Sequence, residues 1–372
     1  MNAMHISGDR AFAIIVTMLV VGGAGIFLSA ALGLLARENV SLGHIAVTQL
    51  LLGLVPGLIA LAILRFMPPA WLMKLIVPLY IGAIALTCLV FIPGIGVHAG
   101  GATRWIDLGP FTVQPAEFLK IGVVLMFALY LAKTKDKIKE WRYGLLGYGL
   151  IVGIPAFILL MQPNTSTVLI LGATTAALYF LAGAPWRDFA ILALITIIAV
   201  GALVMTRPYL MHRVTTFINP AGDSLGKGYQ IQQSLIAIGS GGLLGRGFGQ
   251  SVQKFNYLPE PVGDSVFAVY GEEFGFLGTV FLVLLFTAFA ARGFTIASQA
   301  KDSFGSYAAA GLTLIITLSA LMNIGAMLGV LPLTGLPLPF VSHGGTALLC
   351  ALASVGIILN VAAHRTKKRA LV

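Results

Sequence analysis

The chain consists of long apolar runs separated by short polar segments. About ten of these runs approach 20 residues, the length that a helix needs to cross the hydrocarbon core of a membrane. They cover residues 11–31, 46–66, 73–93, 113–132, 143–162, 165–184, 189–206, 265–291, 306–331 and 341–362. The pattern predicts an all-α polytopic membrane protein with about ten transmembrane helices, folded as a single domain over residues 1–372.

Composition supports a membrane protein. Hydrophobic residues make up 58% of the chain and charged residues only 10%, whereas soluble domains carry about 25% charged residues. This composition excludes a large soluble enzyme. Cys88 and Cys350 both fall within apolar runs, where we expect buried free thiols. The first run follows Arg10 without a clear cleavage site, so we expect a retained span and not a signal peptide.

The net charge of +10 is explained by topology. If the N-terminus is cytoplasmic, 15 of the 23 Lys and Arg residues fall in cytoplasmic segments and seven fall outside, with Lys120 inside a span. An excess of Lys and Arg in short cytoplasmic loops is what the positive-inside rule describes. An even number of spans places both termini in the cytoplasm. We interpret the basic runs as anchors on anionic membrane lipid, and expect no nucleic-acid partner.

One long segment, residues 206–264, departs from the apolar pattern and is predicted to form a large extracytoplasmic loop before the eighth span. Glycines, glutamines, basic residues and acids are concentrated in it and just beyond it. Polar residues beside a membrane are costly to keep and generally functional. A structureless loop of this length is unusual in a compact protein. The alternation of apolar residues and glycines between Gln230 and Phe255 predicts short amphipathic or re-entrant helices.

A second outer loop, residues 93–112, leads into a candidate charge pair. Pro115 suits the first turn of a helix. Glu117 and Lys120, three residues apart, then fall on one face of the fourth span near its outer end. The pair either locks two helices together or lines a polar cavity. Arg104, in the preceding loop, is a candidate for binding a negatively charged group.

Asp264 is the strongest single candidate for chemistry. It begins the eighth span. If that span is one continuous helix, Gly271, Gly275 and Gly278 follow on the same face, where another helix or a lipid chain could approach closely. Glu272 would then lie about 12 Å deeper. An Asp at the start of a helix is commonly an N-cap, so the residues alone leave both capping and catalysis open.

The segment from Asn323 to Gly345 joins the last two spans and reads NIGAMLGVLPLTGLPLPFVSHGG. A loop without carboxylates or Lys and Arg at membrane depth must be buried in protein or line a cavity. His343, near its end, is either a hydrogen-bonded packing residue or a substrate contact.

Three ordered motifs resemble the SEDS family of polytopic glycosyltransferases, which includes FtsW, RodA and SpoVE. They are GATRWIDLGPFTVQPAEFLK, the stretch from HRVTTFINPAGD to GEEFGFLG, and the segment that joins the last two spans. Within the second motif, GFGQSVQKFNYLPEP is closer to FtsW than to RodA. Two positions depart from the family pattern. Asn164 replaces the aspartate of QPDLG, which removes a charge, and His343 replaces a tyrosine.

The resemblance implies peptidoglycan glycosyltransfer at the outer face of the bacterial cytoplasmic membrane, for division or elongation. The substrate would be lipid II, a disaccharide pentapeptide on undecaprenyl pyrophosphate. Asp264 would take the acceptor's proton, supported by Glu117 and Lys120, with inversion at the anomeric carbon. Lys120, Arg104, Arg213 or a divalent cation (Mg²⁺ or Mn²⁺) would neutralise the departing pyrophosphate. The candidate substrate contacts are Arg104, Gln114, Asn164, Arg213, Gln230, Lys254, Glu260, Ser342 and His343. No metal-ligand cluster is expected.

Two other functions stay open on the sequence. One is a flippase or transporter for the lipid-linked precursor, and the other is a non-catalytic scaffold for a transpeptidase. Transporters place charged or unwound sites near the midplane in both halves, whereas here only Glu272 and Glu273 would lie deep. The scaffold predicts that loss of Asp264 leaves function intact. The resemblance also implies a partner, a single-span class B penicillin-binding protein, because no peptide-crosslinking domain is visible in this chain.

Overall fold

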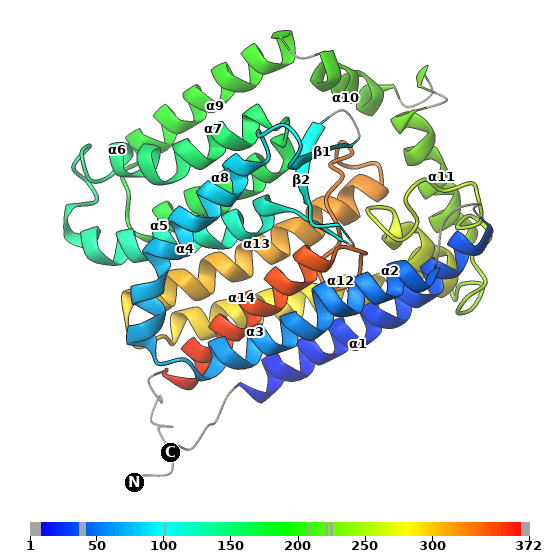
Figure 1. The fold of residues 1–372 in the computed structure, drawn as a ribbon, viewed down its shortest axis with the longest axis horizontal. Coiled ribbons are helices and arrows are strands. Elements are labelled where there is room, and N and C mark those ends of the chain that lie inside the picture. Colours follow the sequence, from blue (N-terminus) through cyan, green and yellow to red (C-terminus); the bar gives the residue numbers. More distant parts are fainter. Residues whose placement is uncertain are drawn as a thin grey trace.

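The computed structural model describes residues 9–36, 42–99, 102–109, 111–206, 208–219, 222–223 and 226–365. Within these ranges the chain forms a bundle of helices that run obliquely across Figure 1. The helices are α1 (Arg10–Leu32), α2 (Leu42–Thr48), α3 (Val55–Phe66), α4 (Pro69–Leu89), α5 (Pro115–Thr134), α6 (Leu145–Tyr148), α7 (Ile154–Met161), α8 (Thr165–Leu181), α9 (Trp186–Thr206), α10 (Pro208–Ile218), α11 (Lys227–Ser240), α12 (Val266–Ser298), α13 (Ser303–Met327) and α14 (Gly345–Ala363). Short π-helical segments (Gln49–Leu54 and Gly149–Gly153) join α2 to α3 and α6 to α7, and 3-10 helices cover Gly33–Ala36 and Lys135–Lys137.

The predicted fold class is confirmed, but the count of ten spans is not. Among the described residues, eight helices are long and apolar enough to cross a membrane. Two further apolar helices, Leu145–Met161 and Thr165–Leu181, are shorter. Seventeen residues rise only about 25 Å, less than the roughly 30 Å of a hydrocarbon core. Both cysteines are free, but Cys88 is exposed, so the expectation of a buried thiol is wrong there.

The core of the bundle is formed by α5, α13 and α14. Between 67% and 83% of the apolar window of each of these helices is buried inside the protein, against 6% for α9. Leu119 of α5, Leu312 of α13 and Leu352 of α14 have no exposed surface. In Figure 1, α9 lies along the upper edge of the molecule, apart from this core. Most side chains of the three central helices are therefore surrounded by protein.

A small antiparallel sheet lies in the predicted loop before α5. Its strands are β1 (Gly96–Ala99), β2 (Ala102–Asp107) and β3 (Thr112–Val113), in the order β1-β2-β3. Ile106 of β2 pairs with both Gly96 and Val113. Strands this short leave little alternation for a sequence pattern to reveal, and the sheet was not predicted. It holds Arg104, on β2, near the N-terminal end of α5.

The helix α12 is broken at Gly275, whose backbone angles (φ 63°, ψ −162°) are not helical. A Cβ placed on Gly271 would lie 3.4 Å from Cγ2 of Thr279, although eight residues of a straight helix span about 12 Å. The chain therefore bends sharply at the break. The continuous glycine face that was expected from the sequence is therefore wrong. We call residues 266–274, ahead of the break, the half-helix.

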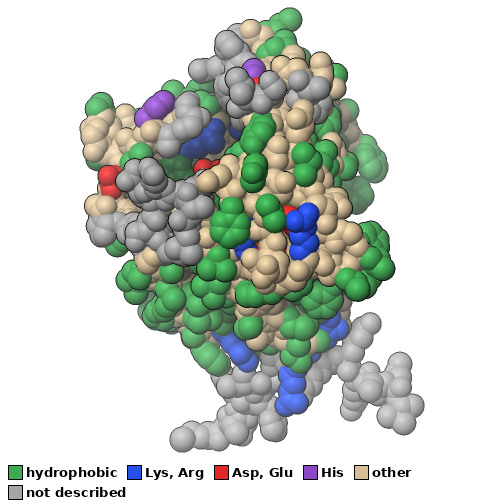
Figure 2. Space-filling view, turned by 90° about the vertical axis from the view of Figure 1, so that its right-hand side faces the viewer, with side chains coloured by type: hydrophobic (Ala, Val, Ile, Leu, Met, Phe, Trp, Pro, Cys, Tyr) green, Lys and Arg blue, Asp and Glu red, His purple; other side chains and the backbone are tan. Residues whose placement is uncertain are grey.

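The described chain begins and ends at the same end of the bundle. Nη1 of Arg365 lies 2.9 Å from Oδ2 of Asp9, and Nη2 of Arg292 lies 2.8 Å from the same atom. Basic side chains are also visible at the lower end of the molecule in Figure 2. An even number of membrane crossings requires this arrangement. Near the other end, α10 and α11 occupy the predicted long loop, so α11 confirms that this segment contains a short helix.

Candidate active site

The candidate site is built around residues 328–344, between α13 and α14, which we call the proline loop. From Leu333 to Val341 its Leu, Phe and Val side chains are buried, as expected for irregular backbone at membrane depth. Ser342 Oγ accepts a hydrogen bond from the N–H of Leu338 (2.8 Å) and donates one to the carbonyl oxygen of Gly263 (2.6 Å). The Ser342 side chain therefore joins the proline loop to the turn that precedes α12.

The carboxylate of Asp264 is bound by α11 and lies one residue before the N-cap position of α12. The N-cap position belongs to Ser265, where no side-chain capping bond forms. Gln230 Nε2 donates to Asp264 Oδ1 at 3.0 Å. Asn323 Nδ2 donates both to the backbone oxygen of Asp264 (2.8 Å) and to that of Leu336 in the proline loop (2.7 Å). Two helices, α11 and α13, and the proline loop thus fix the position of Asp264, which stays partly exposed.

Glu117 and Lys120 form the expected ion pair inside the bundle. Lys120 Nζ lies 2.8 Å from Glu117 Oε1, and the two side chains are 12% (Lys120) and 6% (Glu117) exposed. They line a cavity of about 40 Å³ together with Ser319, Ser354 and Leu336 among others, which is enough space for a few water molecules. Leu336 belongs to the proline loop, so the pair and Asp264 approach that loop from different helices.

Arg213 approaches the proline loop through α8. Its Nη1 donates to Ser166 Oγ at 3.4 Å, and that hydroxyl donates to the carbonyl oxygen of Thr334 at 2.9 Å. The next residue, Gly335, has φ +65°, and a Cβ there would lie 4.0 Å from Asp264 Oδ2. Arg213 and Asp264 are therefore connected through one turn of the proline loop.

Arg104 and Asn164 meet at the start of α8. Arg104 donates from Nε to the backbone oxygen of Gln162 (3.2 Å) and from Nη2 to that of Pro163. Asn164 is the buried N-cap residue of α8, and its Oδ1 accepts from Thr167 Oγ1 at 2.8 Å. A neutral amide at residue 164 is thus integrated into the first turn of the helix.

Three further candidates lie around the edge of this cluster. Gln114 is the N-cap of α5, and its N–H donates to Thr346 Oγ1 at 3.4 Å. The ring of His343 stacks on Phe27 with 6.0 Å between centroids. Glu260 is exposed and has φ +47°, in the turn just before Asp264.

Lys254 does not join the residues around Asp264. Its side chain has no exposed surface, and Nζ lies 2.7 Å from Glu273 Oε1. A substrate contact needs an accessible side chain, so we leave Lys254 out of the proposed site. From the sequence, Lys254 is as good a candidate for substrate binding as Arg213. The sequence does not show that Lys254 is buried or that it pairs with Glu273, 19 residues further along the chain.

Polar residues that the sequence pattern did not single out also hold the site together. Gln49 Nε2 donates to the backbone oxygen of Ser342 (3.3 Å), and Gln49 Oε1 accepts from the N–H of Gly344 (3.0 Å). Asn323 and Ser166 bind the proline loop as described above. These residues could have been found in the sequence as amides or hydroxyls within apolar runs. Burying such a side chain in a membrane is costly unless it forms hydrogen bonds. Among the described residues, no three His, Cys, Asp or Glu side chains are grouped as metal ligands.

Asp223 orders the segment between α10 and α11. Its carboxylate accepts hydrogen bonds from the N–H groups of Gly228 (3.2 Å) and Gly226 (3.0 Å), at the start of α11. The bond from Gly228, with smaller contributions from Thr216 and the nearby His212, holds the pKa of Asp223 below its usual value. A charged Asp223 therefore stabilises the start of the helix that carries Gln230.

Comparison with known proteins decides the family. The FtsW/RodA/SpoVE family model, described as a cell cycle protein, matches residues 10–367. The chain belongs to this family. It is 41% identical over 279 residues to the stage V sporulation protein E of Bacillus subtilis (strain 168), a match that covers 75% of this chain and 76% of that protein. It is 39% identical over 288 residues to a probable peptidoglycan glycosyltransferase FtsW of Geobacter sp. (strain M18), covering 77% and 78%.

Several solved structures are similar over nearly the whole chain. A chain from a peptidoglycan synthase complex, studied for the structural coordination of polymerization and crosslinking, superposes with a TM-score of 0.76 at 29% identity. The rod shape determining protein RodA of Thermus thermophilus superposes with a TM-score of 0.68 at 28% identity. Both comparisons cover 97% of this chain and 99% of the other. The family resemblance drawn from the three motifs is confirmed.

Proposed function

We propose that this chain is a peptidoglycan glycosyltransferase that polymerises lipid II into glycan strands at the outer face of the bacterial cytoplasmic membrane, in division or elongation. Family membership supports the reaction class. One observation carries the proposal: Asp264 is partly exposed and held by Gln230 at the proline loop, against which Lys120 and Arg213 are also arranged. These contacts support a role for a carboxylate base and two cations at the proline loop.

In the proposed reaction, the acceptor hydroxyl oxygen attacks the anomeric carbon of the donor sugar. The new C–O bond forms as the bond to the lipid pyrophosphate breaks, and the electron pair leaves with that pyrophosphate. Asp264 accepts the hydroxyl proton. A single displacement converts an α-linked donor into a β-linked product. The hydrogen bond from Gln230 to Oδ1 orients the carboxylate for this transfer.

The departing pyrophosphate requires positive charge. Lys120 and Arg213 are the candidates whose contacts connect them to the proline loop. Glu117 holds the Lys120 ammonium group in place. Arg104 binds the backbone oxygens of Gln162 and Pro163, a few residues before Ser166, which contacts Arg213. Mg²⁺ or Mn²⁺, when bound, would be held by Asp264 together with substrate phosphates, a donor set that such ions accept, and would neutralise charge on the leaving group.

The proposed orientation places the end with Asp9 and Arg365 in the cytoplasm and the Asp264 end outside. The excess of Lys and Arg in the predicted cytoplasmic segments supports it. The proposed partner is a class B penicillin-binding protein, which would crosslink the strands. The similarity to a chain from a peptidoglycan synthase complex supports a partner of this kind.

The test is polymerisation of fluorescent lipid II by the purified, folded protein, alone and with its co-expressed transpeptidase. We expect a ladder of glycan chains, longer or more abundant with the partner. Folded protein that makes no polymer in the complex would contradict the proposal. Translocation of labelled lipid II across vesicles without polymer would instead favour the flippase.

A further inference from the structure

The break in α12 is closed by a loop from a distant part of the chain. A helix end leaves backbone carbonyl groups without partners, and the next helix start leaves N–H groups without partners. Here residues 242–247 satisfy two groups of each set. The N–H groups of Arg246 and Gly247 donate to the oxygens of Glu272 and Glu273 (3.0 and 2.9 Å), and those of Phe276 and Leu277 donate to the oxygens of Gly242 and Leu243 (2.8 and 3.1 Å).

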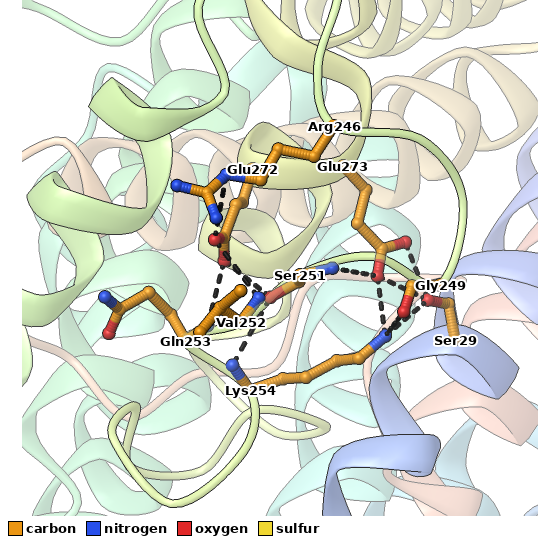
Figure 3. A network of polar contacts seen from close by, with 9 residues as sticks. All are labelled: Ser29, Arg246, Gly249, Ser251, Val252, Gln253, Lys254, Glu272 and Glu273. Carbon is orange, nitrogen blue, oxygen red and sulfur yellow. Dashed lines mark hydrogen bonds and ion pairs between the residues drawn. The ribbon is translucent and has the colours of Figure 1, made fainter.

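The two glutamates at the end of the half-helix point in different directions (Figure 3). Glu273 is bound by Lys254, whose Nζ also donates to the backbone oxygen of Gly249 (2.9 Å) and to Ser29 Oγ (3.1 Å). These three acceptors match the three protons of the ammonium group. Ser29 Oγ in turn donates to Glu273 at 2.6 Å. Because Ser29 is on α1, this buried cluster joins the half-helix to α1.

Glu272 binds the same loop from the other side. Its carboxylate accepts from Ser251 Oγ (2.6 Å) and from the N–H groups of Val252 and Gln253 (both 3.1 Å). Arg246 Nε lies 3.5 Å away and is 42% exposed. The loop is therefore attached to both glutamates, while the Lys254–Glu273–Ser29 cluster supplies the link to α1.

Stability alone is a weak explanation for this cluster. Negative charge at the C-terminal end of a helix opposes the helix dipole, and a buried ion pair is often no more stabilising than apolar packing. Position is a better explanation. The half-helix has nine residues, about 13 Å, with Asp264 just before its first residue and Glu273 at its end. Attachment of Glu273 to α1 therefore fixes the orientation of the short half-helix, and with it the position of Asp264 at the opposite end.

We infer that Lys254 and Glu273 are positioning residues, which hold Asp264 in its reactive geometry by anchoring the far end of the half-helix to α1. This inference rests on the proposed function of Asp264. Misplacing a catalytic group by about 1 Å can cost about 10²-fold in rate, so a small tilt of the half-helix suffices to impair the reaction. Substrate binding by the other residues around the proline loop would be largely retained.

The main experiment compares Lys254→Met and Glu273→Gln with Asp9→Asn, in the full chain with its partner. Asp9 is a matched control because it also is a buried carboxylate that joins α1 to α12, through Arg292, but away from Asp264. We expect both cluster variants to lower kcat for lipid II polymerisation about 10–100-fold with KM within about twofold of wild type. Asp9→Asn should leave kcat unchanged.

A second measurement, amide hydrogen exchange over residues 266–274, needs no activity. The cluster variants should exchange faster there than wild type, and Asp9→Asn should not. Unchanged exchange and unchanged kcat in Glu273→Gln would overturn the inference, as would an equal loss of kcat in Asp9→Asn. If wild-type protein makes no polymer, the proposed function fails, while the exchange result still decides whether the cluster holds the half-helix.

The reversed pair, Lys254→Glu with Glu273→Lys, distinguishes positioning from folding failure. The double reversal restores opposite charges at the two positions. It should therefore have a higher kcat and slower amide exchange over residues 266–274 than either single reversal. Equal damage in the double and single reversals would mean that the two side chains do not act as a pair, and would overturn the inference. Glu273→Gln keeps the size of the side chain and so remains testable where Lys254→Met does not fold.

Discussion

At Asp264, the carboxylate lies one residue ahead of the N-cap position of α12. Ser265 occupies the N-cap position of α12, and the Asp264 carboxylate accepts from Gln230 on α11. Replacement by Asn keeps the size of the side chain but removes the ability to take up a proton at neutral pH. The side chain is therefore expected to matter for proton transfer more than for the start of the helix.

We predict that Asp264→Asn folds, inserts and binds its partner but loses polymerisation by about 10²–10⁴-fold, the usual contribution of a general base. The measurements are glycan-chain length from lipid II and thermal stability of the solubilised complex. Asp264→Ala should be similarly stable and inactive. Substantial polymer from the Asn variant would remove Asp264 as the base and make Glu117 the next candidate.

Glu117 and Lys120 are predicted to be energetically coupled. Removing one member of a buried pair typically costs about 3–5 kcal/mol, because the other charge is left unpaired. Reversing both charges should therefore be less damaging than the sum of the two single reversals, in both unfolding free energy and polymerisation. A double reversal as damaging as that sum would show that the two residues are not partners, despite their 2.8 Å contact.

At the scale of elements, the half-helix depends on close backbone packing around Gly245. This glycine has φ +83°, and a Cβ on it would overlap the backbone oxygen of Glu273. Gly242, three residues earlier, also has a positive φ (55°), but a Cβ on it would have no atom within 4 Å. Substitution of Gly242 therefore tests backbone strain alone, whereas substitution of Gly245 tests backbone strain together with steric overlap.

We predict that Gly242→Ala costs about 1–2 kcal/mol, the strain of a left-handed backbone, and that Gly245→Ala costs clearly more. The excess should appear as a lower thermal unfolding midpoint and as faster amide exchange in residues 266–274. Equal stability of the two variants would show that the loop moves aside freely, and that the contact with Glu273 does not hold the half-helix.

At the scale of the whole molecule, Asp9 joins the two ends of the described chain to α12. Burial alone would raise the pKa of Asp9, but the hydrogen bond from Phe12 and the charges of Arg292 and Arg365 outweigh it and lower the pKa below its ordinary 3.8. A lowered pKa in the folded state means that the ionised carboxylate stabilises the fold. This stabilisation is fully present above the unfolded pKa and is lost as pH falls through the folded value.

Asp9→Asn is predicted to lower stability by about 1–3 kcal/mol at pH 7, as for hydrogen bonds to charged groups. Partial exposure of Arg292 and Arg365 keeps the effect in this range. The difference from wild type should shrink below about pH 4, because wild type then loses the same charge. Thermal unfolding of both proteins in detergent at several pH values is the measurement. If the stability difference between wild type and Asp9→Asn grew as the pH fell, the lowered pKa of Asp9 would be contradicted.

Features that depend on neighbours along the chain could be predicted from the sequence alone. Apolar runs must become helices in a membrane, since no water satisfies their backbone groups. Glu117 and Lys120 meet because residues three apart share a helix face. The motifs placed the chain in its family. They also singled out Asp264 as the candidate base, and its hydrogen-bond partner Gln230 was among the candidates.

Features that depend on distant contacts required the folded structure. A helical projection assumes an unbroken helix, but α12 bends at Gly275 because residues 242–247 supply the hydrogen bonds that the break leaves open. Lys254, which reads as an exposed cation, is buried against Glu273, and Glu273 also binds Ser29, 244 residues away. No local pattern encodes such pairings, because burial and partners arise only when the separate segments pack together.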